Sequence, residues 1–430
     1  MNVNKTNNTI DKVRQLQRKL YQSAKSNKSR RFHALYDKIY RKDILVKAWK
    51  QVKANKGSAG VDEQTIVDIE NIGVEKILEE IQIQLSEGIY NPPPVLRTEI
   101  PKENGKIRPL GIPTVKDRII QTATKIVIEP IFEANFKECS YGFRPKRNQH
   151  GALDAIRRAC NNKGMWVVDA DISGYFDNIN HSKLLLLVER RISDRRIIKL
   201  IRKWLKAGVM KDGVFAESDI GSPQGGVISP LLANIYLDYL DTVWEKYYRH
   251  LGKLIRFADD FVVVCKNYKD VKHAHKAISL IMQRLELSLN KDKTKIISLW
   301  DGKEGFDFLG YHNRKIKTKT IDGRIYYVLK QWISKKATKK VFNKVKETLG
   351  RKTLYVSLDE IIKILNRKIV GWRNYYGLSP FDKLAKVDKY IRMRLVFWYN
   401  NKRQARKRKE FYNLVSFFNN TGLKYVAQNS

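Results

Sequence analysis

The sequence has 430 residues, of which 43% are hydrophobic and 10% aromatic, which is enough for a packed core and excludes general disorder. Lysine and arginine outnumber aspartate and glutamate by 84 to 44, so the formal net charge is +40. Such an excess predicts a polyanionic partner, usually nucleic acid, with a membrane surface as the competing interpretation. No apolar run approaches the roughly 20 residues that a membrane-spanning helix needs, so we expect no membrane partner.

The start of the chain and its cysteines predict a compartment. The opening segment MNVNKTNNTIDK lacks the apolar region of a secretory signal. Cys139, Cys160 and Cys265 are widely spaced and form no C-x-x-C pair, which argues against a zinc module and against a disulfide framework. We therefore expect a reducing, cytoplasmic location.

The N-terminal region is basic and helical in pattern. The first 50 residues hold 14 Lys+Arg and 3 Asp+Glu, a net charge of 14 − 3 = +11. Apolar residues recur every three or four positions from Val13 to Leu45, which predicts helix. The excess of positive charge favours a helix that contacts phosphate over a helix whose charged face is only exposed to solvent. A loop of turn formers follows at Asn55–Asp62, and Asn91–Pro94 makes a stiff break before a predicted strand at Val95–Ile100.

Three β-rich runs in the middle of the chain end in or flank carboxylates. The first is Trp166–Ile172, and the others are Leu254–Ala258 and Phe261–Cys265, separated only by Asp259 and Asp260. Two strands this close must form a hairpin with the aspartates near its tip. Helical patterns at Ser182–Gly208 and Ser229–Lys246 lie between these runs. This order predicts an α+β fold, an antiparallel sheet with helices packed on one face.

The last 100 residues hold 24 Lys+Arg and 6 Asp+Glu, a net charge of 24 − 6 = +18. Their pattern is mostly helical, with aromatic residues interleaved. A dense basic run near the end is predicted to bind nucleic acid through Lys402, Arg403, Arg406, Lys407, Arg408 and Lys409.

The paired aspartates suggest phosphoryl transfer by two metal ions. Adjacent carboxylates repel and raise each other's pKa, and a bound cation would compensate. Magnesium prefers oxygen ligands, so carboxylates from two separate strands suffice. The second carboxylate should end another strand, as Asp171 does, but chemistry alone leaves Asp169 and Asp177 as alternatives.

Several ordered motifs resemble those of group II intron-encoded reverse transcriptases and maturases, a family that includes domesticated group II-like bacterial enzymes. The matching segments run from about Asn55 to about Tyr376 and are Ile100–Lys102, Gly105–Pro113, Ser140–Pro145, Asp171–Asp177, Pro223–Asn234, Phe257–Asp260, Leu289–Lys295, Phe308–Tyr311 and Gly371–Tyr376. Phe257 stands where the family more often has tyrosine, a change that keeps the ring and should preserve activity. After Arg394 the chain leaves the family pattern.

The resemblance implies a right-hand polymerase with fingers, palm and helical thumb. The segments expected on this basis are a basic helical extension (1–54), fingers (55–165), palm (166–320), a helical thumb or maturase-like region (321–400) and a short basic tail (401–430). No Cys/His-rich endonuclease module is evident in the sequence.

The resemblance also implies roles for matching residues. Asp171, Asp259 and Asp260 would be catalytic and, with the backbone carbonyl of Ile172, would hold two Mg²⁺ ions, for which Mn²⁺ could substitute. The dNTP would meet Lys102, Arg108, Phe176 and Gln224, with Phe176 as an aromatic gate against a ribose 2′-hydroxyl. Further nucleic-acid contacts would come from Arg144, Lys293, Lys295 and Gly310, although a structural turn explains Arg144 equally well.

The leading hypothesis is therefore an RNA-directed DNA polymerase that binds a structured RNA and copies it, with an RNA template, a DNA or RNA primer and dNTPs as partners. Within it, an intron maturase without an endonuclease domain competes with a domesticated antiviral enzyme that copies a non-coding RNA. A non-catalytic splicing factor and an RNA-dependent RNA polymerase are the remaining alternatives. The intact aspartates argue against the former, and the bulky Phe176 argues against the latter.

Overall fold

The computed structural model describes residues 3–101, 107–211, 214–216, 221, 225–319, 321–403, 418 and 422–427, and the statements below refer to these residues. They form two compact units, each discontinuous in sequence. The first unit comprises residues 1–148, 170–263 and 272–295, and the second comprises 149–169, 264–271 and 296–430. The five contiguous segments expected from the sequence stay a prediction.

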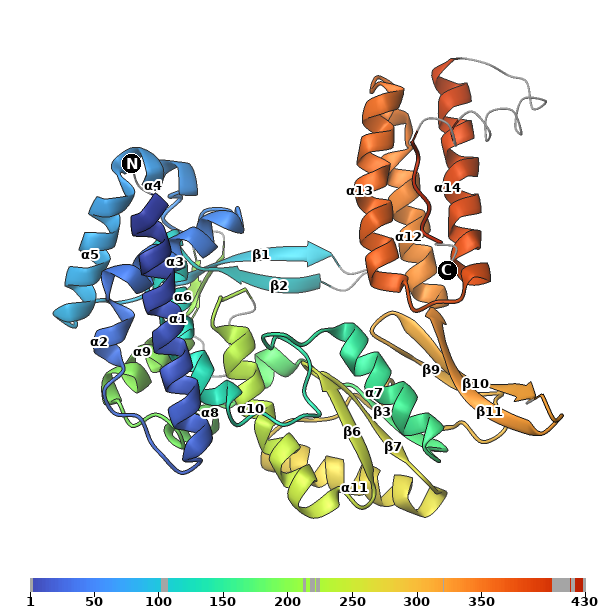
Figure 1. Ribbon diagram of the computed structural model, residues 1–430. Helices are drawn as coiled ribbons and strands as arrows, with labels where there is room; N and C mark the ends of the chain where they lie inside the picture. The colour runs from blue at the N-terminus through green and yellow to red at the C-terminus, as the bar shows by residue number, and fades with distance from the viewer. Residues whose placement is uncertain are drawn as a thin grey trace. The chain divides into compact units, whose positions relative to one another are not determined.

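The chain mixes helices and strands throughout (Figure 1). The helices are α1 (Val3–Ser26), α2 (Tyr36–Ile39), α3 (Lys42–Ala54), α4 (Ile66–Ile72), α5 (Val74–Ser86), α6 (Val115–Glu133), α7 (Gln149–Asn161), α8 (His181–Glu189), α9 (Arg195–Lys206), α10 (Ser229–Val243), α11 (Tyr268–Arg284), α12 (Lys335–Thr348), α13 (Leu358–Tyr376) and α14 (Phe381–Lys402), with short 3-10 or π segments η1 (Tyr175–Asn178), η2 (Trp244–Tyr248) and η3 (Arg351–Thr353). The strands are β1 (Val95–Pro101), β2 (Ile107–Ile112), β3 (Trp166–Ala170), β4 (Val209–Lys211), β5 (Val214–Ala216), β6 (Gly252–Phe257), β7 (Asp260–Cys265), β8 (Lys295–Ser298), β9 (Gly305–Phe308), β10 (Tyr311–Lys319) and β11 (Ile325–Ile333).

The predicted helix from Val13 to Leu45 is interrupted, which the sequence pattern did not show. Helix α1 ends where the side chain of Asn27 accepts hydrogen bonds from the next backbone N–H groups. The chain then extends so that the Phe32 N–H donates to the Arg191 carbonyl and the Ser193 N–H donates to the Phe32 carbonyl, each at 2.8 Å. These two hydrogen bonds pair the N–H and the carbonyl of Phe32 outside a helix. The chain becomes helical again only in α2 and α3.

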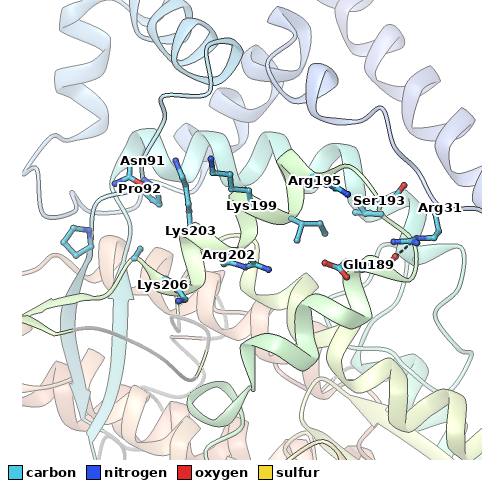
Figure 2. Close-up of a pocket in the computed structure, with 14 residues that line it drawn as sticks. Arg31, Asn91, Pro92, Glu189, Ser193, Arg195, Lys199, Arg202, Lys203 and Lys206 are labelled. Atoms are coloured by element: carbon cyan, nitrogen blue, oxygen red, sulfur yellow. Dashed lines mark hydrogen bonds between the residues drawn. The ribbon is translucent and has the colours of Figure 1, made fainter.

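The predicted helix Ser182–Gly208 is likewise two helices, α8 and α9. Asp194, 4% exposed, begins α9 by accepting the Arg196 N–H at 3.1 Å. Its other carboxylate oxygen accepts the N–H groups of Leu35 and Tyr36 at 3.0 and 2.9 Å, which ties α9 to the N-terminal segment. Helix α9 buries an apolar face, and Figure 2 shows lysine and arginine side chains on its other face.

Two four-stranded sheets have the orders β2-β1-β4-β5 and β6-β7-β3-β8. In the first, β1 and β2 are antiparallel from Leu96 opposite Ile112 to Pro101 opposite Ile107, and β4 is parallel to β1. In the second, β6 and β7 are joined by only two residues, so they form the predicted hairpin.

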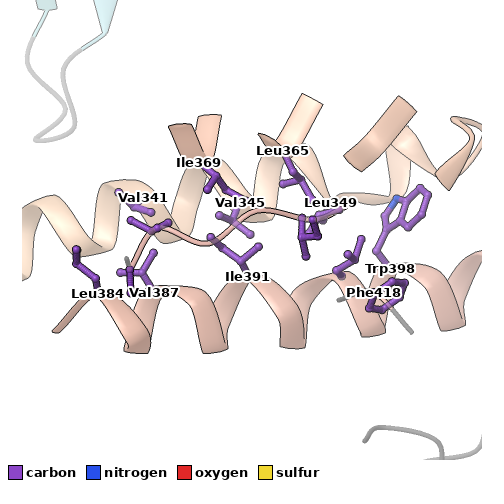
Figure 3. Close-up of a cluster of buried hydrophobic side chains, with 14 of the residues drawn as sticks. Val341, Val345, Leu349, Leu365, Ile369, Leu384, Val387, Ile391, Trp398 and Phe418 are labelled. Atoms are coloured by element: carbon purple, nitrogen blue, oxygen red, sulfur yellow. The ribbon is translucent and has the colours of Figure 1, made fainter. Parts of the chain in front are cut away.

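The second unit contains the sheet β11-β10-β9 and a bundle of three helices. Gln331 donates to the Leu153 carbonyl at 3.0 Å, and the Asn161 side chain accepts the Leu329 N–H at 2.8 Å, so β11 is bonded to α7. Helices α12, α13 and α14 lie side by side in the bundle (Figure 1). Figure 3 shows its apolar core, which includes Val341, Val345, Leu349, Leu365, Ile369, Leu384, Val387, Ile391, Trp398 and Phe418.

Residues 422–427 are bonded to this bundle. The Asp388 carboxylate accepts the N–H groups of Val426 and Ala427 at 2.7 and 2.9 Å, and the guanidinium of Arg392 lies 3.6 Å from the ring centre of Tyr425. Within the described ranges, no helix is both long and apolar enough to cross a membrane.

Candidate active site

The candidate site is built on the β6–β7 hairpin of the first unit. Both strands are mostly buried, and the two residues between them are Ala258 and Asp259, with Asp260 starting β7. Ala258 has φ = +58°, a left-handed conformation that costs about 1 kcal/mol or more for a residue with a Cβ atom. Surrounding contacts must therefore hold this turn in place.

Arg256 supplies those contacts from within β6. Its side chain is completely buried and forms an ion pair with the buried Asp241 of α10, with Nε 2.9 Å from Oδ1. The same guanidinium donates to the Ala258 carbonyl at 2.9 Å, to Asn234 Oδ1 at 3.0 Å and to Ser140 Oγ at 2.9 Å. Burial alone would lower the pKa of Arg256, but the Asp241 carboxylate outweighs burial and raises it, so the guanidinium stays charged.

The motif Ser140-Tyr141-Gly142 packs directly against this turn. The Tyr141 N–H donates to the Arg256 carbonyl at 2.8 Å, and Asn234 donates to the Gly142 carbonyl at 2.8 Å. A Cβ atom on Gly142 would clash with the backbone nitrogen of Ala258, so only glycine allows this approach. Three of the family-like motifs thus meet at one turn and fix the position of the aspartates.

Asp171 lies just beyond β3, on backbone that pairs with residues 288–290. Its carbonyl accepts the Asn290 N–H at 2.8 Å, and Ile172 forms an antiparallel bridge with Leu289. The Lys293 ammonium lies 2.8 Å from Asp171 Oδ2, and the lysine side chain is 63% exposed. Lys293, expected to contact nucleic-acid phosphate, here neutralises a candidate catalytic carboxylate.

The three aspartates influence one another electrostatically. Enclosure by the protein, followed by the charges of Asp259 and Asp171, raises the pKa of Asp260 to about 6, and Lys293 opposes this rise. Asp260 is nevertheless exposed to solvent, so its carboxyl group is accessible to a cation. This accumulation of negative charge, offset by one exposed lysine, is what a divalent cation would relieve.

Carboxylates are ligands that magnesium prefers, and the charges of Asp171 and Asp259 both act on Asp260. Among the described residues, however, no three Asp, Glu, His or Cys side chains are arranged to hold a metal ion.

The Phe176 turn lies beside this cluster. Phe176, in η1, is half-buried, and its ring centre is 5.3 Å from that of Tyr175, whose hydroxyl donates to the Ala233 carbonyl at 2.6 Å. Gly221 (φ = +97°) lies so close that a Cβ atom there would come within 3.0 Å of the Phe176 carbonyl oxygen. Gly225 (φ = +118°) abuts the Gly111 carbonyl of β2. Gly221 and Gly225, on either side of 222–224, thus lie against the Phe176 turn and against β2.

Several other predicted site residues lie partly or wholly outside the part of the chain that the structure describes. Arg108 lies in β2 opposite Ile100, and its side chain is outside the described atoms. Lys102, Gln224, Arg406, Lys407, Arg408 and Lys409 lie outside the described residues. Lys295 is exposed at the start of β8, which is compatible with a phosphate contact.

For Arg144 the structure favours the structural alternative. Its side chain is 3% exposed and forms an ion pair with Glu133 at 2.7 Å. It also donates to the Lys137 and Ser140 carbonyls at 2.6 and 2.9 Å. A guanidinium buried with these partners braces the turn before Pro145 and does not face a template.

Gly310 and Lys402 also have structural partners. Gly310 (φ = +78°) makes the tight β9–β10 turn, where the Leu309 carbonyl accepts the Tyr375 hydroxyl at 3.1 Å. Lys402 donates to the Leu354 and Val356 carbonyls at 2.7 and 2.8 Å, so its ammonium stabilises the bundle. Arg403 is exposed, with its guanidinium 5.5 Å from the ring centre of Tyr399.

Sequence reasoning missed the Arg256 network and the contact between Lys293 and Asp171. One signal was available for the first: an arginine within the apolar run of β6, three residues before the paired aspartates. A charged residue there needs a buried partner, and Asp241 is one of two carboxylates on α10, a helix whose buried residues are mostly apolar.

Fold and site together define a nucleic-acid polymerase, and comparisons with known proteins agree. Residues 100–313 match the family described as "Reverse transcriptase (RNA-dependent DNA polymerase)", and residues 338–414 match "Group II intron, maturase-specific domain". Group II intron-encoded protein LtrA of Lactococcus lactis subsp. cremoris is 32% identical over 441 residues, covering 82% of this chain and 72% of the relative. Protein YkfC of Escherichia coli (strain K12) is 34% identical over 359 residues, covering 74% and 93%.

A solved structure described as "Partial Cas6-RT-Cas1--Cas2 complex" is 26% identical, with a TM-score of 0.36, and covers 58% of this chain and 42% of that chain. On the sequence relatives, the chain belongs to the family of group II intron-encoded reverse transcriptases and maturases. The α+β right-hand polymerase fold and the activity of an RNA-directed DNA polymerase are thereby confirmed. Nucleic acid is its class of partner, and the reverse-transcriptase family generally uses divalent metal ions.

Proposed function

We propose that Asp171, Asp259 and Asp260, with the Ile172 carbonyl, hold two Mg²⁺ ions, replaceable by Mn²⁺, and that the enzyme copies an RNA template into DNA from a DNA or RNA primer. Two observations at the tip of the β6–β7 hairpin support this most directly. Arg256 holds the turn by donating to the Ala258 carbonyl, and the charges of Asp259 and Asp171 raise the pKa of Asp260. When bound, the ions would activate the attacking hydroxyl and stabilise charge on the transferring phosphoryl group.

The protein's own residues would orient the reactants. Arg108, in β2, and Lys102, the residue after β1 in the sequence, would grip the triphosphate, where positive charge stabilises the transition state. The half-buried Phe176 would exclude a ribose 2′-hydroxyl by its volume. Gln224 would line the same pocket, which the close approaches of Gly221 and Gly225 to the Phe176 turn and to β2 support.

In its biological role, we propose, the enzyme acts as a maturase in the cytoplasm, binding the structured RNA of a group II intron. The maturase-specific match at residues 338–414 and the basic C-terminal region, with its net charge of +18, support a structured RNA as the partner. The three free cysteines are compatible with a reducing compartment.

The test is primer extension on poly(rA)/oligo(dT) by an Asp259→Asn/Asp260→Asn variant. We expect dNTP incorporation to be abolished and RNA affinity to be retained, because the basic surface is untouched. Asp171→Asn should behave in the same way, whereas Asp177→Asn, an exposed aspartate six residues later, serves as the matched control and should retain activity. Mg²⁺ removal by EDTA should stop extension, and Mn²⁺ should restore it. Extension by the double variant would refute the assignment.

A further inference from the structure

Helix α9 borders a hollow of about 1150 Å³ in the first unit whose lining is strongly cationic. Among the described residues that line it, six are lysine or arginine and Glu189 is the single acidic residue. Figure 2 shows the α9 side chains between Asn91 and Pro92 at one end and Ser193, Glu189 and Arg31 at the other. None of the lining residues belongs to the candidate active site.

The charges are segregated along α9 with helical periodicity. Arg195, Lys199, Arg202 and Lys206 recur every three or four residues and are exposed, whereas the intervening apolar residues are buried. Like charges at this spacing destabilise a helix, since each repels the next one along the same face. The fold does not require them, because the apolar face already attaches α9 to the core.

These four cations have no structural partner within the described part of the chain. No ion pair or hydrogen bond there engages their side chains, in contrast to Arg196, which pairs with Asp194 at 3.4 Å, and Lys203, which donates to the Tyr90 carbonyl. Arg31, at one end of the hollow, is likewise held, by the Glu189 carbonyl at 2.9 Å. The hollow thus has anchored cations at its edges and four free ones along its length.

The arrangement fits a linear polyanion better than a small anion or a membrane. Helix α9 has 12 residues and so extends about 18 Å, with a free cation at each turn. A single phosphate would engage only one or two of them. A membrane-binding helix would present apolar residues beside its charges, but the apolar face of α9 is buried.

We propose that this hollow, which we name the α9 site, binds the sugar-phosphate backbone of an RNA segment outside the polymerase active site. The contacts would be to phosphates and so independent of base sequence. We choose RNA because the chain belongs to the family of group II intron-encoded proteins. The inference depends on the proposed binding of structured RNA. It does not depend on the proposed metal ligands or on the basic C-terminal run. It adds a second RNA anchor, carried by a helix of the first unit.

The experiment compares Lys199→Gln/Arg202→Gln/Lys206→Gln with a control of equal charge change, Lys76→Gln/Lys253→Gln/Lys276→Gln, whose lysines are exposed in the same unit. The probe is a fluorescent RNA stem-loop with a blocked 3′ end, so that it cannot be extended. Its affinity is measured by anisotropy over a range of salt concentrations. Because three phosphates would no longer be neutralised, the slope of log affinity against log salt should fall by about 2–3, and binding should weaken on the order of tenfold at low salt.

The control triple should keep a slope close to that of the wild type. Extension of a short poly(rA)/oligo(dT) substrate should be unchanged in both variants, which separates this site from the catalytic proposal. An unchanged salt slope in the α9 variant, or an equal decrease in the control, would overturn the proposal. A DNA stem-loop of the same sequence whose affinity fell more than that of the RNA would also overturn it, because the site would then serve DNA. Circular dichroism confirms that α9 variants are folded.

Discussion

The guanidinium of Arg256 donates to the carbonyl oxygen of Ala258 at 2.9 Å while paired with Asp241, so a buried ion pair holds the strained turn that presents Asp259. Arg256 thus connects Asp241 of α10 to the backbone beside the candidate catalytic aspartates. The position of Asp259 and Asp260 therefore depends on Arg256 and Asp241, which lie outside the aspartate cluster.

We expect Arg256→Met to destabilise the protein by about 3–5 kcal/mol, because Asp241 would stay buried without its partner. Pairing it with Asp241→Asn removes that lone charge and should restore most of the stability. The double variant still lacks the hydrogen bond to Ala258, so its kcat should stay low while its KM for dNTP changes little. Urea unfolding and steady-state extension measure the two effects. Full recovery of kcat together with stability would show that Arg256 has no positioning role.

Sugar selection should depend on the volume of Phe176. Phe176→Ala would open space for a 2′-hydroxyl, so the ratio of rNTP to dNTP incorporation should rise at least about tenfold, since excluding a group by shape is worth roughly 1–3 kcal/mol. Phe176→Tyr keeps the ring and is the control, with the ratio close to wild type. Single-nucleotide incorporation with each substrate gives the ratio, and equal ratios in all three proteins would place Phe176 in the core instead.

The contribution of the buried carboxyl group of Asp117 to the free energy of unfolding should fall as the pH rises from about 4 to about 7. Burial raises the pKa of Asp117 to about 7, although the hydroxyl of Tyr90 donates to it. The folded state therefore binds a proton in this window that the unfolded state has released, so raising the pH removes stability. Asp117→Asn cannot ionise, and its urea midpoint should fall less steeply between about pH 4 and about pH 7 than that of the wild type. Parallel pH profiles would contradict the assignment. Asp238, whose pKa burial also raises to about 7, contributes in the same direction to both proteins.

The basic run at residues 403–409 should bind structured RNA, with Lys402 left in place because it stabilises the bundle. Replacing Arg403, Arg406, Lys407, Arg408 and Lys409 by Gln should weaken binding of a group II intron RNA and lower the salt slope by about 0.7–0.9 for each phosphate that is no longer neutralised. Extension on poly(rA)/oligo(dT) should change much less. An unaltered slope would make the run a solubilising segment, and equal damage to extension would place it in the general template path. Lys402→Gln alone is the structural control and should lower stability without changing the slope.

The sequence predicted the hairpin correctly because its signal is local. Apolar runs flank Asp259 and Asp260 on both sides, and two residues leave room for a turn only. The family motifs placed Asp171 at the same site, which chemistry alone had left open against Asp169 and Asp177. The electrostatic influence of Asp171 on Asp260 agrees with that choice.

What the sequence could not show depends on partners far along the chain. The break between α8 and α9 exists because Asp194 accepts N–H groups of Leu35 and Tyr36, about 160 residues earlier. Helical periodicity continues across that break, so a local pattern overlooks it. Arg144 was assigned to nucleic acid from the family motif, with a structural turn as the alternative, and Lys402 from the charge of its basic run; their carbonyl partners show a structural use for both.

The bonds between α7 and β11 set an order for events on the ribosome. The hydrogen bond from the Leu329 N–H to the Asn161 side chain cannot form until a further 168 residues have been synthesised. Translation adds about 5–20 residues per second, so synthesis of these residues takes about 10–30 s. By the end of this interval the nascent chain carries Asp171, Asp259 and Asp260, whereas the hydrogen bonds between α7 and β11 can form only once Leu329 and Gln331 have been made. The second unit, whose last segment is 296–430, is therefore completed only after the whole sequence of the first unit has been synthesised.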